Sequence, residues 1–290
     1  MFSKLRNKQS SDKKKNPWDE LFINSKKTRA SPLNEFKKLY GIAFTPRSGS
    51  TWLNEAIIKT NKAGNPREWF NTGLSVLSKR IEAYESASIQ DYYQTLKEDK
   101  ATSNNVFGFQ ITWFQAQQIF EHIGHDNLFD DIQTWFWLKR KDFVAQGVSL
   151  FKAIETGKFH SVDKPKNKKE LLYDYKKISR WTLHILQQEK LFADYFKKKG
   201  VSPIALWYED ITADKQTTLK RIYDELNVNQ PNNIVRSQYS KYQPVSDNIN
   251  HDFIDKFKNE HQEFVSYWTS NRQKKLVSEF MQEYPQYRIN

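Results

Sequence analysis

The chain has 290 residues, and its 46 lysines and arginines outnumber its 34 aspartates and glutamates, so its formal net charge at pH 7 is +12. Its 38% of hydrophobic and 15% of aromatic residues suffice for a buried core, in one domain or two. The absence of cysteine from the sequence excludes disulfides and thiolate metal sites, and the positive charge predicts an anionic partner: a nucleotide, a nucleic acid, a membrane surface or an acidic glycan.

Residues 1–32 are expected to form a basic, disordered tail that precedes a single domain over residues 33–290. Within residues 1–16, six lysines and arginines face one acid, and Phe2 is the one aromatic residue, which favours a solvating tail over a nucleic-acid-binding arm. This segment lacks the apolar core of a signal peptide, and no run approaches the ~20 apolar residues of a membrane span. We therefore expect a cytoplasmic protein and leave peripheral membrane contact open.

A strand, a tight loop and a helix are predicted over residues 40–61. The apolar run 40–44 is typical of a buried parallel strand, and apolar residues after Trp52 recur three and four apart, as in a helix. The loop T-P-R-S-G-S-T between them lies at the positive end of the helix dipole, where backbone N–H groups bind anions. The residues expected to contact the anion are Arg47, Ser48, Gly49, Ser50, Thr51 and Trp52.

Strands alternate with helices along the rest of the chain. Residues 106–113, 134–138 and 203–208 are predicted strands, each followed by a helical segment, and the chain after residue 248 is predicted to be mostly helical. Connections of this length specify parallel strands, so we expect a three-layer α/β fold of the P-loop-like kind, with a central parallel sheet flanked by helices and a helical C-terminal part. Ligands of such sheets bind beyond the carboxyl ends of the strands, where Arg47 and Arg140 both fall.

Arg140 and Ser149 are the second pair of candidate binding residues. Arg140 closes the strand at 134–138, and Ser149 lies in the next predicted helix. An arginine fork and a hydroxyl brought together by strand and helix suit a phosphate monoester. In isolation, a surface arginine and a serine that bonds its own helix backbone are the better explanation, so the pair gains weight only beside the loop at Arg47.

Glu68 is the candidate general base. Gly64 and Pro66 end the preceding helix and turn the chain, which can return Glu68 to the rim of the anion site. Taken alone, such a glutamate is more often a solvated turn residue. The six histidines are rival bases, but none stands next to a recognisable motif.

The loop at Arg47 resembles the 5′-phosphosulfate-binding loop of sulfotransferases, which use 3′-phosphoadenosine 5′-phosphosulfate (PAPS). Further segments are similar, in the same order, to the bacterial trehalose 2-sulfotransferase-like branch of these enzymes: residues 63–70, 106–115, 140–149 and 208–211. The resemblance runs over residues 40–228, with a weaker extension to 258. Two positions depart from the pattern, since Gln110 stands where a lysine is common and Tyr242-Gln243 where Arg-Gln is expected. The second departure leaves any late contact to a 3′-phosphate around residues 241–243 unassigned.

The resemblance implies transfer of a sulfuryl group from PAPS to a hydroxyl of a carbohydrate or glycolipid, without a metal ion. It implies that residues 47–52 bind the 5′ end of the nucleotide, that Arg140 and Ser149 bind its 3′-phosphate, and that Glu68 is the catalytic base. Arg47 would also stabilise the leaving phosphate.

Two other functions stay open on the residues alone. A magnesium-dependent P-loop-like kinase or NTPase could use Glu209 and Asp210 as acidic ligands, although the loop has one glycine and lacks the lysine of that motif. A basic nucleic-acid-binding protein would fit the net charge, but the basic residues are scattered and no recognition motif is evident, so we expect no nucleic-acid partner.

Overall fold

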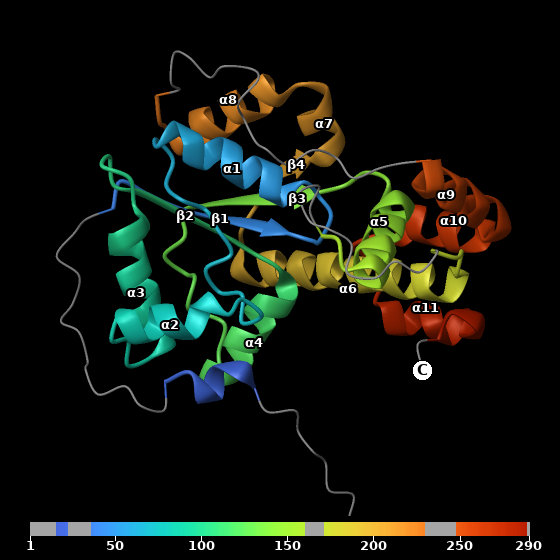
Figure 1. The fold of residues 1–290 in the computed structure, drawn as a ribbon, viewed down its shortest axis with the longest axis horizontal. Helices are drawn as coiled ribbons and strands as arrows, with labels where there is room; N and C mark the ends of the chain where they lie inside the picture. Colours follow the sequence, from blue (N-terminus) through green and yellow to red (C-terminus); the bar gives the residue numbers. More distant parts are fainter. Residues whose placement is uncertain (1–15, 23–35, 160–170, 230–247, 289–290) are drawn as a thin grey trace, which may run out of the picture.

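The computed structural model describes residues 16–22, 36–159, 171–229 and 248–288. Within them, four parallel strands form one sheet in the order β2-β1-β3-β4 (Figure 1). The strands are β1 (Lys38–Phe44), β2 (Val106–Ile111), β3 (Thr134–Lys139) and β4 (Ile204–Trp207). Because β1 pairs with β2 on one side and β3 on the other, the loop that follows β1 lies in the middle of the carboxyl edge of the sheet. The predicted parallel sheet is confirmed.

Helices cover both faces of the sheet, which gives the expected three layers (Figure 1). One face carries α1 (Ser50–Thr60), α7 (Tyr208–Ala213) and α8 (Lys215–Leu226). The other carries α2 (Val76–Ala83), α3 (Ile89–Lys100), α4 (Trp113–Ile123) and α6 (Tyr175–Lys199). At the end toward which the strands point lie α5 (Phe143–Thr156), α9 (Asn248–Glu260), α10 (Gln262–Asn271) and α11 (Val277–Glu283). Short 3-10 helices, η1 (Pro17–Glu20) and η3 (Pro285–Tyr287), occur near the two ends of the described chain.

The central strand β1 is buried on both faces. Tyr40, Ile42 and Phe44 pack with the buried sides of α1 and α8, whereas Leu39 and Ala43 pack with the aromatic cluster on the opposite face of the sheet. This alternation follows from the two-residue period of a strand, and burial on both faces explains the continuous apolar run in the sequence.

The helix α6 connects the sheet to the C-terminal helices (Figure 1). Phe192 and Phe196 in its C-terminal half belong to the aromatic cluster against the sheet, whereas Ile178 and Leu186 in its N-terminal half pack with α5, α9, α10 and α11. One helix therefore contributes to two hydrophobic clusters, which supports our proposal that residues 33–290 form a single domain. The sequence allowed one helix or a pair over residues 171–199, and the structure has one, of 25 residues.

Two strands end sooner than their apolar patterns predict. β2 stops at Ile111 because Thr112 caps α4: its hydroxyl accepts the amide of Gln115, whose side chain in turn accepts the amide of Thr112. This reciprocal capping box begins the helix at Trp113, a residue predicted to be in the strand. β4 likewise ends at Trp207, where α7 begins.

The expectation of a disordered tail is wrong for residues 16–22. They form the 3-10 helix Pro17–Glu20, whose Trp18 is fully buried. Its indole packs on Phe70 and Tyr92, at ring-centroid distances of 6.4 Å each. Burial of this large ring fixes the segment to the sheet-flanking layer, because a tryptophan removes a large apolar area from water. The rest of the expected tail lies outside the described residues.

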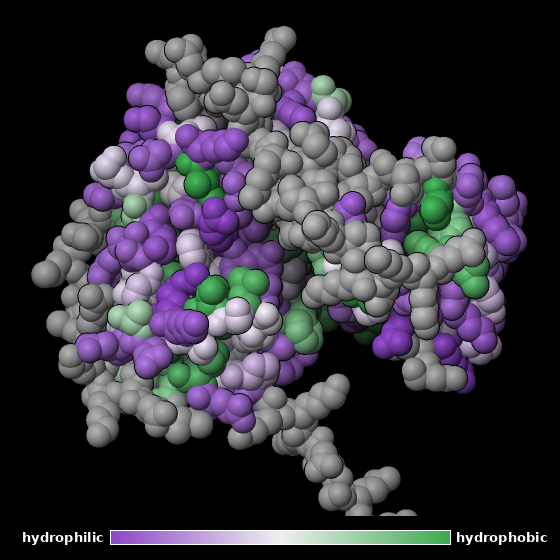
Figure 2. All heavy atoms as spheres, viewed as in Figure 1, coloured by the Kyte–Doolittle hydropathy of each residue, from purple (hydrophilic) through white to green (hydrophobic). Residues whose placement is uncertain are grey.

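The described surface is mainly hydrophilic in the view of Figure 2, with apolar patches between polar side chains. This agrees with a chain in which 28% of the residues are charged. Among the described residues, no helix combines the length and the apolar character that crossing a membrane requires.

Candidate active site

The loop between β1 and α1 brings backbone amides to the carboxyl edge of the sheet. Gly49 precedes the helix with φ 87°, in the left-handed region, and a Cβ there would lie 2.9 Å from the ring of Tyr208, so glycine is required. Arg47 also has a left-handed backbone, φ 67°, a strained conformation that recurs at functional sites. No side chain caps the first turn of α1, whose dipole suits an anion at this position.

Buried polar side chains hold this loop in place. Ser48 was expected to contact the anion, but it is fully buried and its hydroxyl donates to the carbonyl of Thr45 at 2.8 Å, so its side chain stabilises the loop instead. Gln146 of α5 donates to the hydroxyl of Thr45 at 2.9 Å and to the carbonyl of Pro46 at 2.7 Å. The Oε1 atom of Gln146 is buried without a hydrogen-bond partner, which is uncommon in folded proteins.

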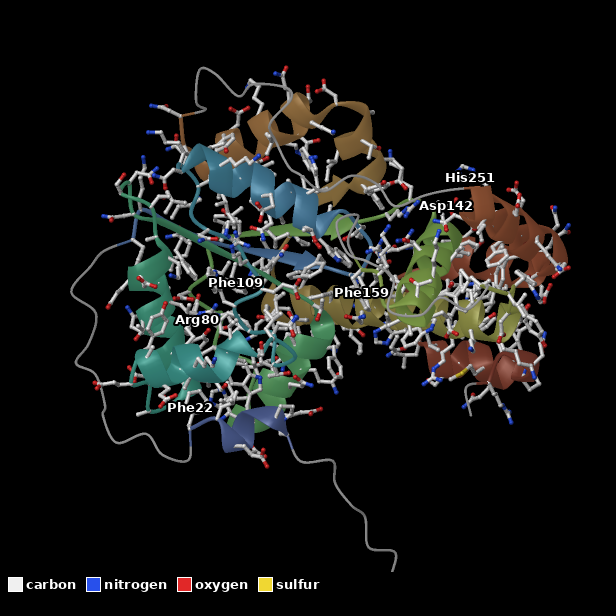
Figure 3. The ribbon with its side chains drawn as sticks, viewed as in Figure 1. Phe22, Arg80, Phe109, Asp142, Phe159 and His251 are labelled. Carbon is white, nitrogen blue, oxygen red and sulfur yellow. The ribbon has the colours of Figure 1, made fainter. Side chains whose placement is uncertain are left out.

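Arg47 and Ser149 contact each other directly. The Nε atom of Arg47 donates to the hydroxyl of Ser149 at 3.0 Å, and its Nη1 atom donates to the carbonyl of Phe159. Phe159 lies between the strand ends and α5 (Figure 3). Ser149 was expected to act with Arg140, but no hydrogen bond joins these two described residues. Arg47 thus links the loop between β1 and α1, called the donor loop below, to α5, the helix that carries Ser149.

Arg140 stacks on Tyr208 and forms a long ion pair with Glu209. Its guanidinium carbon lies 4.6 Å from the ring centroid of Tyr208, and its Nε atom is 3.8 Å from the Glu209 carboxylate. That Nε atom is buried and has no hydrogen-bond partner. Because the ring of Tyr208 also lies against Gly49, Arg140 and the donor loop border the same aromatic side chain. A guanidinium group whose buried Nε atom makes no hydrogen bond can still donate to an anionic ligand.

The carboxylates at the end of β4 are engaged by protein groups. Glu209 accepts the amide of Lys141 at 2.9 Å and that of Asp142 at 3.4 Å, and Asp210 pairs with the ammonium of Lys141 at 2.6 Å. The two acids proposed as magnesium ligands for a kinase therefore bind the loop after β3. Nothing in the sequence indicated these contacts.

Glu68 lies near the carboxyl end of β2, because the chain before it follows the outer side of that strand. Gly64, with φ 74°, packs so closely that a Cβ would lie 2.9 Å from the amide nitrogen of Gly108. The amide of Gln110, near the end of β2, donates to the carbonyl of Arg67 at 3.1 Å. Glu68 follows directly, and β2 neighbours β1, so its carboxylate lies on the side of the site opposite β3.

The carboxylate of Glu68 is oriented by two amide donors. Gln115 donates to its Oε2 atom at 2.8 Å, and Asn71 donates to the same atom at 2.9 Å. Gln115 is itself fixed by the capping box with Thr112. The Oε1 atom accepts no hydrogen bond from the described residues, so one carboxylate oxygen remains for a substrate proton. Gln115 lies in the segment 106–115, which resembles a sulfotransferase motif, but nothing in the sequence indicated that it contacts Glu68.

Other candidates lie away from these contacts. Trp52 packs near α8, where the ammonium of Lys215 is 5.3 Å from its ring centroid. Trp69 and Phe70, the two aromatic residues after Glu68, are buried in the core and do not offer a surface for a sugar ring. The segment around residues 241–243 lies outside the described residues.

Lys139, the last residue of β3, lies between two indole rings. Its ammonium is 4.0 Å from the ring centroid of Trp137 and 4.6 Å from that of Trp207, and the residue is 6% exposed. Burial lowers the pKa of Lys139 from 10.5 to about 8; nearby Glu189 opposes this change, and Arg272 adds to it.

Lys139→Met is expected to stabilise the protein at pH 7. As the pH rises, the folded wild type loses this proton before the unfolded state does. The contribution of Lys139 to the free energy of unfolding is therefore least favourable below pH 8 and improves toward pH 10.5. One pKa unit corresponds to about 1.4 kcal/mol, so the rise is on the order of 3 kcal/mol. The measurement is the difference between variant and wild type in free energy of unfolding by urea across this pH range. Lys220→Met, which removes an exposed lysine paired with Asp224, is the control. A difference that does not change with pH contradicts the assignment.

The sequence matches known proteins over most of its length. Residues 39–260 match the family model described as Stf0 sulphotransferase. The trehalose 2-sulfotransferase of Mycobacterium tuberculosis strain Erdman is 23% identical over 204 residues, which cover 58% of this chain and 76% of that protein.

Two solved structures superpose on most of this chain. The sulfotransferase domain of the Synechococcus PCC 7002 olefin synthase superposes with a TM-score of 0.45 at 16% identity, covering 80% of this chain and 91% of that one. Mouse sulfotransferase SULT7A1, complexed with PAP, superposes with a TM-score of 0.44 at 13% identity, covering 86% of this chain and 88% of that one.

The family match extends from β1 to the end of α9, so it includes the donor loop, Glu68, Arg140 and Ser149. It confirms the resemblance seen in the sequence and contradicts the alternative of a magnesium-dependent kinase. The chain belongs to the Stf0 sulphotransferase family, and the protein is a sulfotransferase.

Proposed function

We propose that the sulfuryl donor is PAPS and that the acceptor is a hydroxyl of a carbohydrate or glycolipid. The observation that carries this proposal is that two groups suited to anions both border the ring of Tyr208. The donor loop lies against this ring at Gly49, and the guanidinium of Arg140, whose buried Nε atom makes no hydrogen bond, stacks on it as well. A nucleotide with an anionic 5′ group and a 3′-phosphate matches two such features.

In this proposal, the 5′-phosphosulfate binds at the first turn of α1, with the hydroxyls of Ser50 and Thr51 as donors. Arg140 binds the 3′-phosphate together with Ser149. The Ser149 hydroxyl accepts a hydrogen bond from Arg47, so its own hydrogen is left to donate to a phosphate oxygen. The contact between Arg47 and Ser149 couples the two ends of the nucleotide site.

The reaction is a displacement at sulfur. The acceptor oxygen forms a bond to sulfur while the bond from sulfur to the bridging phosphate oxygen breaks, which releases 3′-phosphoadenosine 5′-phosphate (PAP) and a sulfate ester. Negative charge develops on the leaving phosphate at the N-terminus of α1 and beside Arg47, where amide dipoles and a cation stabilise it. The acceptor proton passes to the Oε1 atom of Glu68, whose other oxygen is held by Gln115 and Asn71.

The acceptor side carries exposed apolar side chains. Leu74 is 43% exposed and follows Glu68 by six positions, and Phe114 is 55% exposed and precedes Gln115, which binds Glu68. The segment containing Leu74 packs on α4, because Thr72 donates to Gln118, one turn after Phe114, at 3.1 Å. An apolar border beside a general base supports an acceptor with an apolar surface of its own, such as a sugar face or a lipid chain.

PAP is expected to raise the melting temperature in the presence of a metal chelator. A ligand that binds only the folded state stabilises it by about 2.7 kcal/mol at 100 times its dissociation constant. Thermal shift measurements with PAP, with ATP plus magnesium, and with a single-stranded oligonucleotide separate the alternatives. Stabilisation by the oligonucleotide or by ATP plus magnesium, without stabilisation by PAP, contradicts the proposal.

A further inference from the structure

Arg272 forms a buried ion pair that joins the C-terminal helices to α6. It lies directly after α10, and its side chain is 13% exposed. Its Nε atom donates to Glu189 at 2.7 Å, and its Nη2 atom donates to the second carboxylate oxygen at 2.6 Å. Glu189 is fully buried and also accepts from Gln273 at 3.3 Å. A two-point contact of this kind fixes the plane of the guanidinium group.

The same guanidinium group holds the backbone of the loop after β3. Its Nη2 atom donates to the carbonyl of Arg140 at 2.7 Å, and its Nη1 atom donates to the carbonyl of Lys141 at 3.0 Å. From the other direction, Glu209 accepts the amides of Lys141 and Asp142. The loop is therefore held through consecutive carbonyls by an arginine and through consecutive amides by a glutamate.

We infer that Arg272 is a positioning residue for the 3′-phosphate site and acts through the backbone of Arg140. The side chain of Arg140 makes no hydrogen bond at Nε, so its direction depends on the ring of Tyr208, on the ion pair with Glu209 at 3.8 Å and on the position of its own backbone. Arg272 fixes that backbone. This inference rests on the proposed function, because it assigns Arg140 to the 3′-phosphate. Arg272 lies beyond residues 39–260, so the family match does not account for it.

The variant Arg272→Lys tests this inference. Lysine keeps the positive charge, but its three N–H donors on one nitrogen cannot replace the four hydrogen bonds of Arg272, two to Glu189 and two to backbone carbonyls. The readout is the ratio of the dissociation constants for adenosine 5′-phosphate and PAP, which differ only in the 3′-phosphate. We expect this ratio to fall by about tenfold, the size of effect seen when a residue that orients a ligand-binding side chain is replaced. Arg221→Lys is the matched control, because Arg221 also donates to a backbone carbonyl, that of Ala205, at 3.0 Å.

The ratio distinguishes positioning from a purely structural role. A lower melting temperature with an unchanged ratio means that Arg272 only joins the helices, and it overturns the inference. If the wild type itself binds the two nucleotides equally, the proposed function fails instead. An unchanged ratio in the control and a reduced ratio in Arg272→Lys support the inference.

Two further measurements apply if Arg272→Lys does not fold. Glu189→Gln keeps the shape of the partner and removes its charge, and it should lower the same ratio. In the wild type, hydrogen exchange followed by mass spectrometry should show more protection of residues 262–276 with PAP than with adenosine 5′-phosphate, because coupling between two sites is reciprocal. Equal protection by saturating amounts of both nucleotides overturns the inference without any variant.

Discussion

Glu68→Gln is expected to lower turnover by about 10²- to 10⁴-fold and to leave nucleotide affinity nearly unchanged. The structure explains why this substitution isolates the base. Gln115 and Asn71 both donate to the Oε2 atom of Glu68, and the carbonyl oxygen of a glutamine can accept the same two hydrogen bonds. The amide group of the glutamine then takes the position of Oε1, where it cannot accept a proton. The local structure is kept and the proton acceptor is lost.

The measurement pairs sulfuryl transfer to a sugar with a titration of PAP for each variant. Glu55→Gln is the matched control, because it also neutralises a carboxylate, one that pairs with Arg67 at 3.3 Å, beside Glu68 in the chain. The control should keep near wild-type turnover. If Glu68→Gln also keeps it, the base lies elsewhere, and the histidines are the next candidates.

Arg140→Ala is expected to weaken the binding of PAP by about 10- to 100-fold, since a hydrogen bond to a charged group contributes roughly 1.5–3 kcal/mol. Binding of adenosine 5′-phosphate should change little, because it has no 3′-phosphate. Arg140→Lys should not restore the affinity, since the ammonium lacks the planar fork that stacks on Tyr208 and reaches a phosphate at two points.

Calorimetric titration of both nucleotides measures this difference directly. Lys141→Ala is the control, because it removes the neighbouring cation, which is more than half exposed and pairs with Asp210. Equal losses for both nucleotides in Arg140→Ala mean that Arg140 does not contact the 3′ end.

The strand, loop and helix around Arg47 were predictable because their signals are local. An apolar run that ends in a serine- and glycine-rich turn, followed by helical spacing, is contained in the segment from β1 to α1. The return of Glu68 to the edge of the sheet depends on a turn at Gly64 and Pro66, four and two residues away. Neither prediction required knowledge of which strands are neighbours.

The contacts that organise the site were not predictable because they join distant residues. Arg272 and Glu189 are 83 positions apart, and Arg47 and Ser149 are 102 apart. No spacing or periodicity in the sequence relates such pairs, since they meet only after the sheet and helices have packed. The direction of a side chain is not given by the residue type either: the hydroxyl of Ser48 points inward, to the carbonyl of Thr45 three positions earlier.

The anchored segment around Trp18 was missed for a different reason. The basic residues before it suggest a solvated tail, and one tryptophan among them carries no periodic signal. Its burial depends on a cluster formed by Phe70 and Tyr92 from other segments. The sequence feature that favours an ordered segment here is a tryptophan next to a proline, Pro17-Trp18, within a polar stretch.

The most direct test of the account is transfer of radiolabelled sulfur from PAPS to a panel of sugars and glycolipids by the full chain, with a metal chelator present. The account predicts a labelled sulfate ester on at least one acceptor, formed together with an equal amount of PAP, by the wild type and at a rate lower by about 10²-fold or more by Glu68→Gln. A wild-type protein that binds PAP but labels no hydroxyl on the panel contradicts the proposed acceptor class. One that neither binds PAP nor transfers its sulfur contradicts PAPS as the donor.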